Sequence, residues 1–292
     1  MTITASLALI AITVLAPATQ RSTRPVVETN AAGTVLVRTQ EIEIEPGRFV
    51  RHGPYEGFNA DGSAESKGSY KNGKADGPWR YFFRQGSVAC EGTYVDGLED
   101  GVWTTYSFGQ KKASEGAYEK GRPIGPWRWW LNERFHAEGT FENGLLHGPW
   151  KYSKGKRLLE TGEFRDGRPH GKWSYLHPNG RTIAAGSYEN GERQGPWRSW
   201  HPNGALAAEG RYTAGARSGT WKFFHENGRE AEVGAFKKGR AEGKWTAWHA
   251  DGSTASSGRY RFGMADGMWT ETSADSPPRD VEYHGGKIAP PK

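Results

Sequence analysis

The stretch YENGERQGPWRSWHPNG, residues 188–204, contains the pattern that decides the fold of this protein. It begins with an aromatic residue, Tyr188, and an Asn-Gly pair, continues through Gly195 and Trp197, and ends with a second Asn-Gly pair. Asn-Gly pairs favour the two-residue type I′ turn, whose twist suits a β-hairpin. The stretch therefore predicts a unit of two antiparallel strands that is linked to its neighbours by tight turns.

The same pattern, G-x-[YF]-x-x-G-x-x-x-G-x-W, recurs nine times with a period of 23–24 residues. A fixed period of this length is typical of a repeat array. The sequence therefore predicts an all-β protein, an elongated single-layer antiparallel β-meander built of about nine hairpin repeats. The repeat Trp residues are Trp79, Trp103, Trp127, Trp150, Trp173, Trp197, Trp221, Trp245 and Trp269.

Shortened copies of the pattern flank the array, and we expect them to cap it. One is Gly53-Pro54-Tyr55, and the other contains Val281 and Tyr283. The expected organisation is a signal peptide at 1–18, a linker at 19–52 with one strand at Ile42 to Ile44, the array at 53–286 and a tail at 287–292.

Counting outward from a turn at Asn203-Gly204 predicts the register. Arg198 falls opposite Glu209, an ion pair across the strands, and Trp197 falls opposite Gly210, which is expected to leave room for the indole. The same count places the aromatic residues three positions after each Trp, the Trp+3 column, opposite small residues. This column contains Phe82, Tyr106, Trp130, Trp200, Phe224 and Trp248, and the expected partners are Ala89, Ala113, Ala207, Ala231 and Ala255.

Composition excludes several classes of protein. The 41 Gly residues far exceed the usual share of about 7%. The net charge of +6 is spread among acidic residues without a basic run, so no nucleic-acid partner is expected. The single cysteine, Cys90, excludes an intramolecular disulfide and a thiolate zinc site, and we expect a buried, inert thiol.

The N-terminus resembles a secretory signal peptide. The apolar run LALIAITVLA, residues 7–16, precedes Ala16-Pro17-Ala18, which predicts cleavage after Ala18 and a secreted or periplasmic protein. No Lys or Arg precedes the run. An uncleaved anchor, or a misassigned start and a cytoplasmic protein, therefore stay open as alternatives.

Catalytic and metal-binding motifs are missing from the sequence, which contains no Walker loop, H-E-x-x-H or G-x-S-x-G. Four histidines, His177, His201, His225 and His249, recur every 24 residues. Neighbours at this period are about 10 Å apart, too far to share one metal ion. We therefore expect turn-flanking side chains, and no catalytic residue, metal or cofactor. The Trp+3 column is the candidate binding surface.

Blocks such as YKNGKADGPWRYFFRQG and YENGERQGPWRSWHPNG resemble the MORN-repeat variant family, where MORN stands for membrane occupation and recognition nexus. The resemblance covers about Gly53 to Gly286 and implies a β-hairpin array with scaffolding or binding roles. Bacterial members of the family are often grouped as YwqK-family antitoxins. An export signal does not suit an antitoxin that acts on a cytoplasmic toxin.

Three functions follow as hypotheses. The first is a non-catalytic, exported scaffold for an unidentified protein partner. The second is an extracellular or cell-wall glycan-binding array using exposed aromatic residues, since GKWSYLHPNGRT, residues 171–182, looks somewhat like choline- and glucan-binding cell-wall repeats. The third is a cytoplasmic antitoxin-like partner of a toxin. A membrane surface is a further possible partner and requires a basic face.

Overall fold

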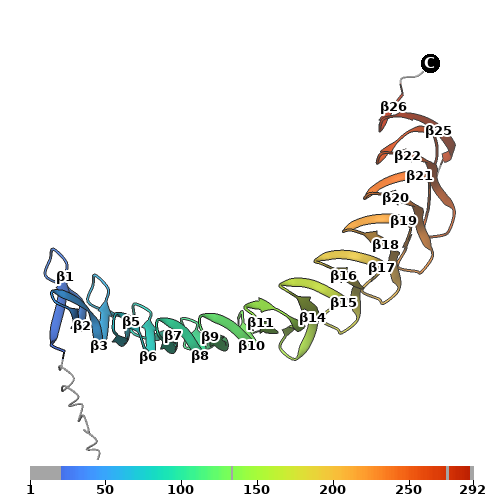
Figure 1. The fold of residues 1–292 in the computed structure, drawn as a ribbon. Coiled ribbons are helices and arrows are strands. Elements are labelled where there is room, and N and C mark those ends of the chain that lie inside the picture. Colours follow the sequence, from blue (N-terminus) through green and yellow to red (C-terminus); the bar gives the residue numbers. More distant parts are fainter. Residues whose placement is uncertain (1–20, 133, 274–275, 290–292) are drawn as a thin grey trace, which may run out of the picture.

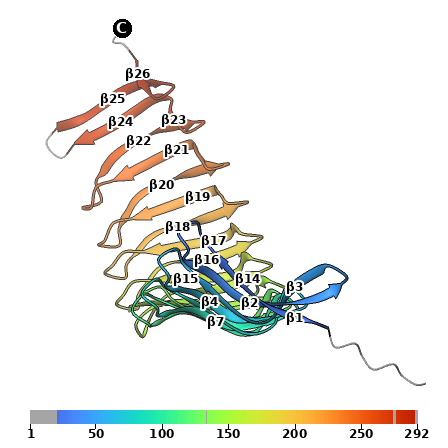
Figure 2. The same ribbon diagram turned by 90° about the vertical axis from the view of Figure 1, so that its left-hand side faces the viewer.

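The computed structural model describes residues 21–132, 134–273 and 276–289. In this part of the chain, 26 antiparallel strands form one sheet, and strands that follow one another in sequence are paired side by side. Figure 1 shows the resulting elongated, curved array, and Figure 2 shows the strands of its C-terminal half stacked like rungs. The predicted all-β single-layer meander is confirmed. The same residues contain no helix that is long and apolar enough to cross a membrane.

The N-terminal half of the sheet contains β1 (Thr23–Thr29), β2 (Val35–Glu45), β3 (Arg48–Phe58), β4 (Ala64–Lys71), β5 (Lys74–Ala75), β6 (Gly77–Phe82), β7 (Val88–Val95), β8 (Leu98–Tyr106), β9 (Lys112–Glu119), β10 (Arg122–Trp130), β11 (Phe135–Glu142), β12 (Leu145–Leu146) and β13 (Gly148–Lys154). The C-terminal half contains β14 (Arg157–Arg165), β15 (Arg168–Leu176), β16 (Thr182–Glu189), β17 (Glu192–Trp200), β18 (Leu206–Thr213), β19 (Ala216–Phe224), β20 (Glu230–Lys237), β21 (Arg240–Trp248), β22 (Thr254–Arg261), β23 (Met264–Ala265), β24 (Gly267–Ser273), β25 (Ser276–His284) and β26 (Lys287–Ile288).

The sheet extends beyond the array boundaries expected from the sequence. Strands β1 and β2 and the first five residues of β3 lie in the segment expected to be a linker, and β2 pairs with both of the others. The reason is an alternating pattern in β2, where Val37 and Thr39 are buried and Arg38 is exposed. At the other end, β26 lies within the expected tail and pairs with β25. The expected signal peptide lies outside the described residues.

The two families of Asn-Gly turns adopt different conformations. At Asn190-Gly191 both residues have positive φ (51° and 87°), and Glu189 pairs with Glu192, which confirms the predicted type I′ turn. At Asn203-Gly204 only the glycine has positive φ. The Asn203 side chain instead accepts the Ala205 amide hydrogen bond at 2.9 Å, as Asn and Asp often do in turns. The prediction of a type I′ turn here is wrong.

This second turn shifts the register at the strand end. Ser199 pairs with Ala208, but Trp200 pairs with Leu206 instead of Ala207, because a β-bulge lies between them. The expected pairing of the Trp+3 column with small residues is therefore wrong throughout. The observed partners are Val88, Lys112, His136, Leu206, Glu230 and Thr254.

Each repeat Trp marks a bend in its strand. Between β16 and β17 the three residues 195–197 lie opposite Gly186 alone, since Ser187 pairs with Gln194 and Ala185 with Arg198. The Trp197 ring fills the space above Gly186, where a Cβ atom would lie 2.2 Å from the indole Cδ2. Its Nε1 donates a hydrogen bond to the Ser187 carbonyl at 3.1 Å.

The predicted register of Trp197 opposite Gly210 is confirmed, but its steric explanation is wrong. A Cβ on Gly210 would meet the ring of Trp221, the Trp of the following repeat, at 2.2 Å. Each glycine therefore accommodates the Trp that comes eleven residues later, so that this contact joins one hairpin to the next.

The face that carries the repeat Trp residues, here called the inner face, is concave. Tyr175 lies two residues after Trp173, and Tyr188 pairs with Gly171, two residues before it, yet the two hydroxyls are 3.0 Å apart. Only a strand bent around the indole brings them together, and Figure 1 shows such bowed strands. Eight of the nine repeat Trp side chains are consequently buried in a single-layer sheet.

Tyr and Phe rings link these Trp residues into one continuous row. Tyr188 lies edge-on to Trp173 and to Trp197, with ring centroids 5.7 and 5.3 Å apart, and the pattern continues to Tyr283 at the C-terminal end. Tyr55 takes the place of Trp in the N-terminal half-repeat and lies 5.4 Å from Trp79. Each edge-to-face pair contributes roughly 0.5–1.5 kcal/mol beyond its burial.

Two 23-residue repeats adjoin Trp150 and interrupt this regularity. In the first, Trp129 pairs with Ala137 and Trp130 with His136 without the usual bulge, and in the second a shorter turn pairs Lys154 with Arg157. Trp150 is only half-buried. The array changes direction around β11 to β14 (Figure 1), so the two shortened repeats coincide with a bend of the whole molecule.

Adding a methyl group beneath a Trp ring is expected to destabilise the array. In Gly186→Ala the new Cβ meets Trp197, which costs about 1–3 kcal/mol or more. Thermal unfolding followed by circular dichroism should show a lower midpoint. The matched control is Gly109→Ala, where the Cβ enters open space with ordinary φ. Equal midpoints for the two variants would contradict this account of the Trp–Gly contact.

Candidate functional site

The histidine column is part of the framework. His201 Nε2 lies 2.7 Å from the Phe224 carbonyl oxygen, and His225 and His249 make the same contact with Trp248 and Thr272 at 2.9 and 3.1 Å. These three side chains tie their turns to the next repeat, as expected of turn-flanking residues, whereas the buried Nε2 of His177 has no hydrogen-bond partner among the described residues. No group of three or more His, Cys, Asp or Glu residues that could hold a metal ion occurs in the part of the chain that the structure describes.

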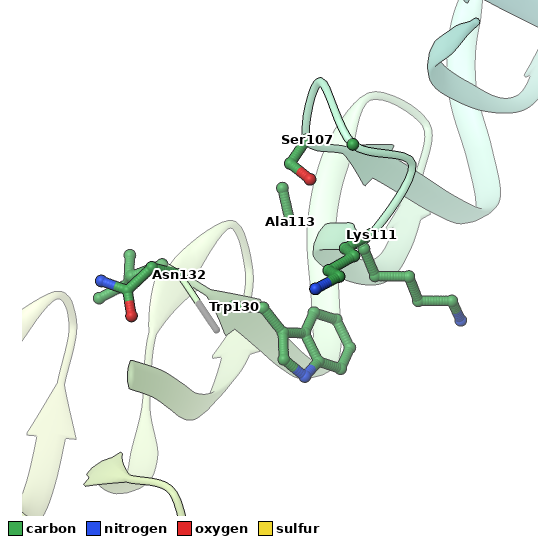
Figure 3. A pocket seen from close by; sticks show the side chains of 8 residues that line it. Ser107, Lys111, Ala113, Trp130 and Asn132 are labelled. Carbon is green, nitrogen blue, oxygen red and sulfur yellow. The ribbon is translucent and has the colours of Figure 1, made fainter. Parts of the chain in front are cut away.

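The Trp+3 column lies on the opposite, outer face, and all six of its side chains are half-buried. Its neighbours there are ion pairs, including the predicted pairs Arg80–Glu91 at 2.9 Å and Arg198–Glu209 at 3.2 Å. One member of the Trp+3 column, Trp130, lines an open hollow of about 750 Å³ together with Leu131. Figure 3 shows the Trp130 ring close to Lys111 at this hollow, while Asn132 points away.

On the inner face, the position two residues after the Trp alternates between large and small side chains on either side of the irregular repeats, where Tyr152 interrupts the alternation, and the last repeat has Glu271. Tyr81, Trp129, Tyr175 and Phe223 are large, whereas Thr105, Ser199 and Ala247 are small. A large ring stacks on the Trp of its own strand and approaches the Trp of the next repeat. Tyr81, for example, lies 5.9 Å from Trp79 and 6.5 Å from Trp103. We call this position between two successive Trp rings the slot.

At two of the small slot residues, Thr105 and Ser199, hollows open on the inner face. The Thr105 hollow has a volume of about 370 Å³. Its floor carries a hydrogen bond between the hydroxyls of Thr105 and Ser114 at 2.7 Å. Aromatic rings dominate its walls, and Glu99 supplies the one charged side chain. The lining residues are Tyr81, Cys90, Tyr94, Glu99, Trp103, Thr105, Ser114, Tyr118 and Trp127.

The Ser199 hollow is smaller, about 220 Å³, and basic. Arg193 and Arg217 lie over the rings of Trp197 and Trp221, with guanidinium-to-centroid distances of 4.6 and 4.7 Å. Such cation–π contacts hold the guanidinium groups against the wall of the hollow. Arg193 also donates a hydrogen bond to the Tyr212 hydroxyl at 3.2 Å. The two hollows thus both have walls of two successive Trp rings but differ in charge.

Ionisable groups on the inner face respond to its low polarity. Burial raises the pKa of the Glu232 and Glu160 carboxyls above the usual range. Burial likewise raises the pKa of the Cys90 thiol, and the neighbouring Glu91 and Glu99 charges act in the same direction. This agrees with the expected inert cysteine, because the reactive thiolate form is disfavoured.

Sequence reasoning selected the outer Trp+3 column and missed the inner hollows. Their positions are nevertheless visible in the sequence as a large–small alternation with a period of two repeats, at Tyr81, Thr105 and Trp129 and again at Tyr175, Ser199 and Phe223. What the sequence does not display is the bend that makes this face concave.

Comparison with known proteins supports the repeat assignment. The model of the MORN repeat variant matches residues 193–214, which form the hairpin of β17 and β18 with the Ser199 slot. These 22 residues are therefore similar to the MORN repeat variant. The predicted resemblance is thereby confirmed, and the matched MORN-variant hairpin has the same register and the same Trp–Gly contact as the regular hairpins around it.

Further comparisons add little. No curated protein matches this sequence. A solved structure of the Photorhabdus luminescens Tc holotoxin pore, carrying a mutation, is similar at 11% sequence identity and a TM-score of 0.17. The match covers 91% of this chain and 16% of that chain. A likeness at this level carries no argument about fold or function.

The raised pKa of Glu232 predicts a pH-dependent stability difference. A carboxyl group whose pKa is raised by folding favours the folded state when protonated, and this contribution is lost as the pH rises through the folded-state pKa. Glu232→Gln should therefore melt higher than the parent at pH 7, and the gain should shrink as the pH falls toward and below 4.5, the ordinary pKa of a Glu carboxyl. Thermal melts across pH test this, with the exposed Glu226→Gln as control. A gain that is constant with pH would contradict it.

Proposed function

We propose that this protein is a non-catalytic scaffold that binds a partner protein along its inner face. The observation that carries the proposal is a set of unpaired charges among the rings of the inner face. On the outer face Arg and Glu neutralise each other across the strands. On the inner face two ion pairs lie near the ends of the sheet, Arg51–Glu28 and Arg279–Glu271. Between them, Arg217, Glu99 and Glu232 form no ion pair with any described residue.

Unpaired charges among half-buried rings are unfavourable unless something else compensates them. A partner of complementary charge would do so, and electrostatic complementarity gives an interface its specificity. Interfaces are also enriched in Tyr, Trp and Arg, which are the residues of the inner face. His201, His225 and His249 and the buried repeat Trp residues are engaged in the framework, which supports a structural repeat with a binding surface rather than an active site.

Glycan binding is a second candidate function, and the observation that favours it is the open hollow beside Trp130. A half-buried aromatic ring that lines an open hollow offers a surface for a sugar ring. A glycan array compares the protein with a variant in which Trp130, Trp200 and Trp248 are replaced by Ala. Binding that depends on these three rings would support this function, and equal signals would remove it.

Export is part of the proposal and rests on the sequence of residues 1–18, which lie outside the described residues. Sequencing the N-terminus of the protein isolated from its source cells tests it. We expect a chain that begins at Thr19, after cleavage at Ala18. An intact Met1 in a cytosolic fraction would overturn export and favour the antitoxin-like alternative.

Reversing the inner-face charges is expected to abolish partner capture. The full-length protein, cross-linked in source cells, should capture a partner. The double variant Glu99→Lys and Arg217→Glu should capture about tenfold less of it, as expected for buried interface charges. The control exchanges an outer pair, Arg80→Glu with Glu91→Arg, and preserves an ion pair there. A partner that the inner variant retains and the control loses would place the binding surface on the outer face.

A further inference from the structure

We propose that the Thr105 and Ser199 hollows are receptor slots, each of which accepts an aromatic side chain of the partner protein. This inference rests on the proposed scaffold function and deepens it, because it names what the inner face recognises. Its basis is that neighbouring repeats fill the equivalent slot with a ring of their own.

The filled slots show the geometry that a guest ring would adopt. Trp127 and Trp129 stack at 5.9 Å with an interplanar angle of 25°, and Trp173 and Tyr175 stack at 6.2 Å and 29°. The ring then meets the next Trp, as Tyr175 meets Trp197 at 6.5 Å. In the slots filled by Tyr81, Trp129, Tyr175 and Phe223, the ring is thus held between two successive indoles, whereas Tyr152 after Trp150 stacks on Phe135 instead.

The two hollows keep these walls and lack the ring. Trp103 and Trp127 bound the Thr105 hollow, and Trp197 and Trp221 bound the Ser199 hollow. An apolar planar group that enters would gain the stacking that the Tyr and Phe rings have elsewhere in the row. The internal copies therefore favour an aryl group over any other occupant, a sugar included.

A hydrogen-bonding group refines the prediction for the Thr105 hollow. In filled slots the Tyr hydroxyl meets a second Tyr hydroxyl, Tyr81 with Tyr94 at 3.2 Å and Tyr175 with Tyr188 at 3.0 Å. The residue at the same offset from Thr105 is Tyr118, which lines the hollow and whose hydroxyl has no hydrogen-bond partner among the described residues. The Thr105 hollow is accordingly complementary to a phenol, the side chain of tyrosine.

The Ser199 hollow differs at this position. Its equivalent residue, Tyr212, already accepts a hydrogen bond from Arg193, and Arg217 lies on the opposite wall. Guanidinium groups stack on aromatic faces and bind carboxylates. This hollow therefore suits an aromatic side chain with an acidic neighbour in the partner sequence.

The alternative is that small slot residues only relieve crowding on a concave face. The two explanations predict opposite effects of filling the slots with the residue that neighbouring repeats use. If the hollows are open slots, a Thr105→Tyr and Ser199→Tyr variant folds and melts no lower than the parent. If they relieve crowding, the added rings clash and the variant melts lower, which would overturn the proposal.

Binding is tested with p-cresol, the side-chain analogue of tyrosine, in saturation-transfer NMR on the full-length protein. The parent should bind this probe, and the filled variant should lose about tenfold in affinity. Thr220→Tyr, which adds the same ring at an exposed outer-face position, is the matched control and should bind like the parent. A parent that does not bind p-cresol, or a filled variant that binds it as well as the parent, overturns the proposal.

Two further outcomes separate this inference from the scaffold function. In the first, methyl β-glucoside binds the parent, and the filled variant loses this binding but keeps the binding of p-cresol. The slots would then recognise sugars, and the proposal would fail. If the filled variant still captures the cross-linked partner at the parent's level, the slots are not where the partner binds. The scaffold function would survive that result, because charge reversal tests it separately.

Discussion

The packing of each Trp indole over a glycine of the preceding strand is the contact on which the rest of the structure depends. It needs a residue without a side chain below the ring, and it needs three residues opposite one so that the strand can bend, both of which are seen at Gly186 and Trp197. The bend makes the inner face concave, and the concavity buries rings in a sheet that has no second layer. Because ring and glycine belong to adjacent hairpins, the contact also carries stability from one repeat to the next.

The regular parts of the register could be predicted from the sequence because local chemistry determines them. The type I′ turn at Asn190-Gly191 and the pairing of Arg198 with Glu209 follow from turn residues and a count along the strands. The second turns show where that reasoning stops. Asn203 follows His201-Pro202 and uses its side chain to accept the Ala205 amide, so an Asn-Gly pair adopts a different turn and shifts the strand end by one residue. The same Asn-Gly dipeptide thus forms two different turns, because the Asn side chain can accept a hydrogen bond from the backbone in one of them.

The candidate site was less accessible to sequence reasoning than the fold. The count along the strands places Thr105 and Ser199 on the same face as the Trp residues, but it treats the strand as straight. In a straight strand, Tyr81 and Tyr94 would be too far apart for their hydroxyls to meet at 3.2 Å. The hollows exist because the bend brings both strands of the hairpin over the indoles. The side chains that line a hollow are close in sequence, but a straight strand would keep them apart.

The irregular repeats around Trp150 constrain any partner that engages both hollows. The Thr105 hollow precedes these repeats and the Ser199 hollow follows them, and the array changes direction between the two (Figure 1). At about 4.8 Å per strand and two strands per repeat, four repeats separate the hollows by about 40 Å along the sheet. A compact domain on one half of the inner face would reach one hollow and leave the other empty. A partner that fills both must be elongated and must follow the curve. The two shortened repeats near Trp150 therefore determine the path of the partner as well as the shape of the scaffold.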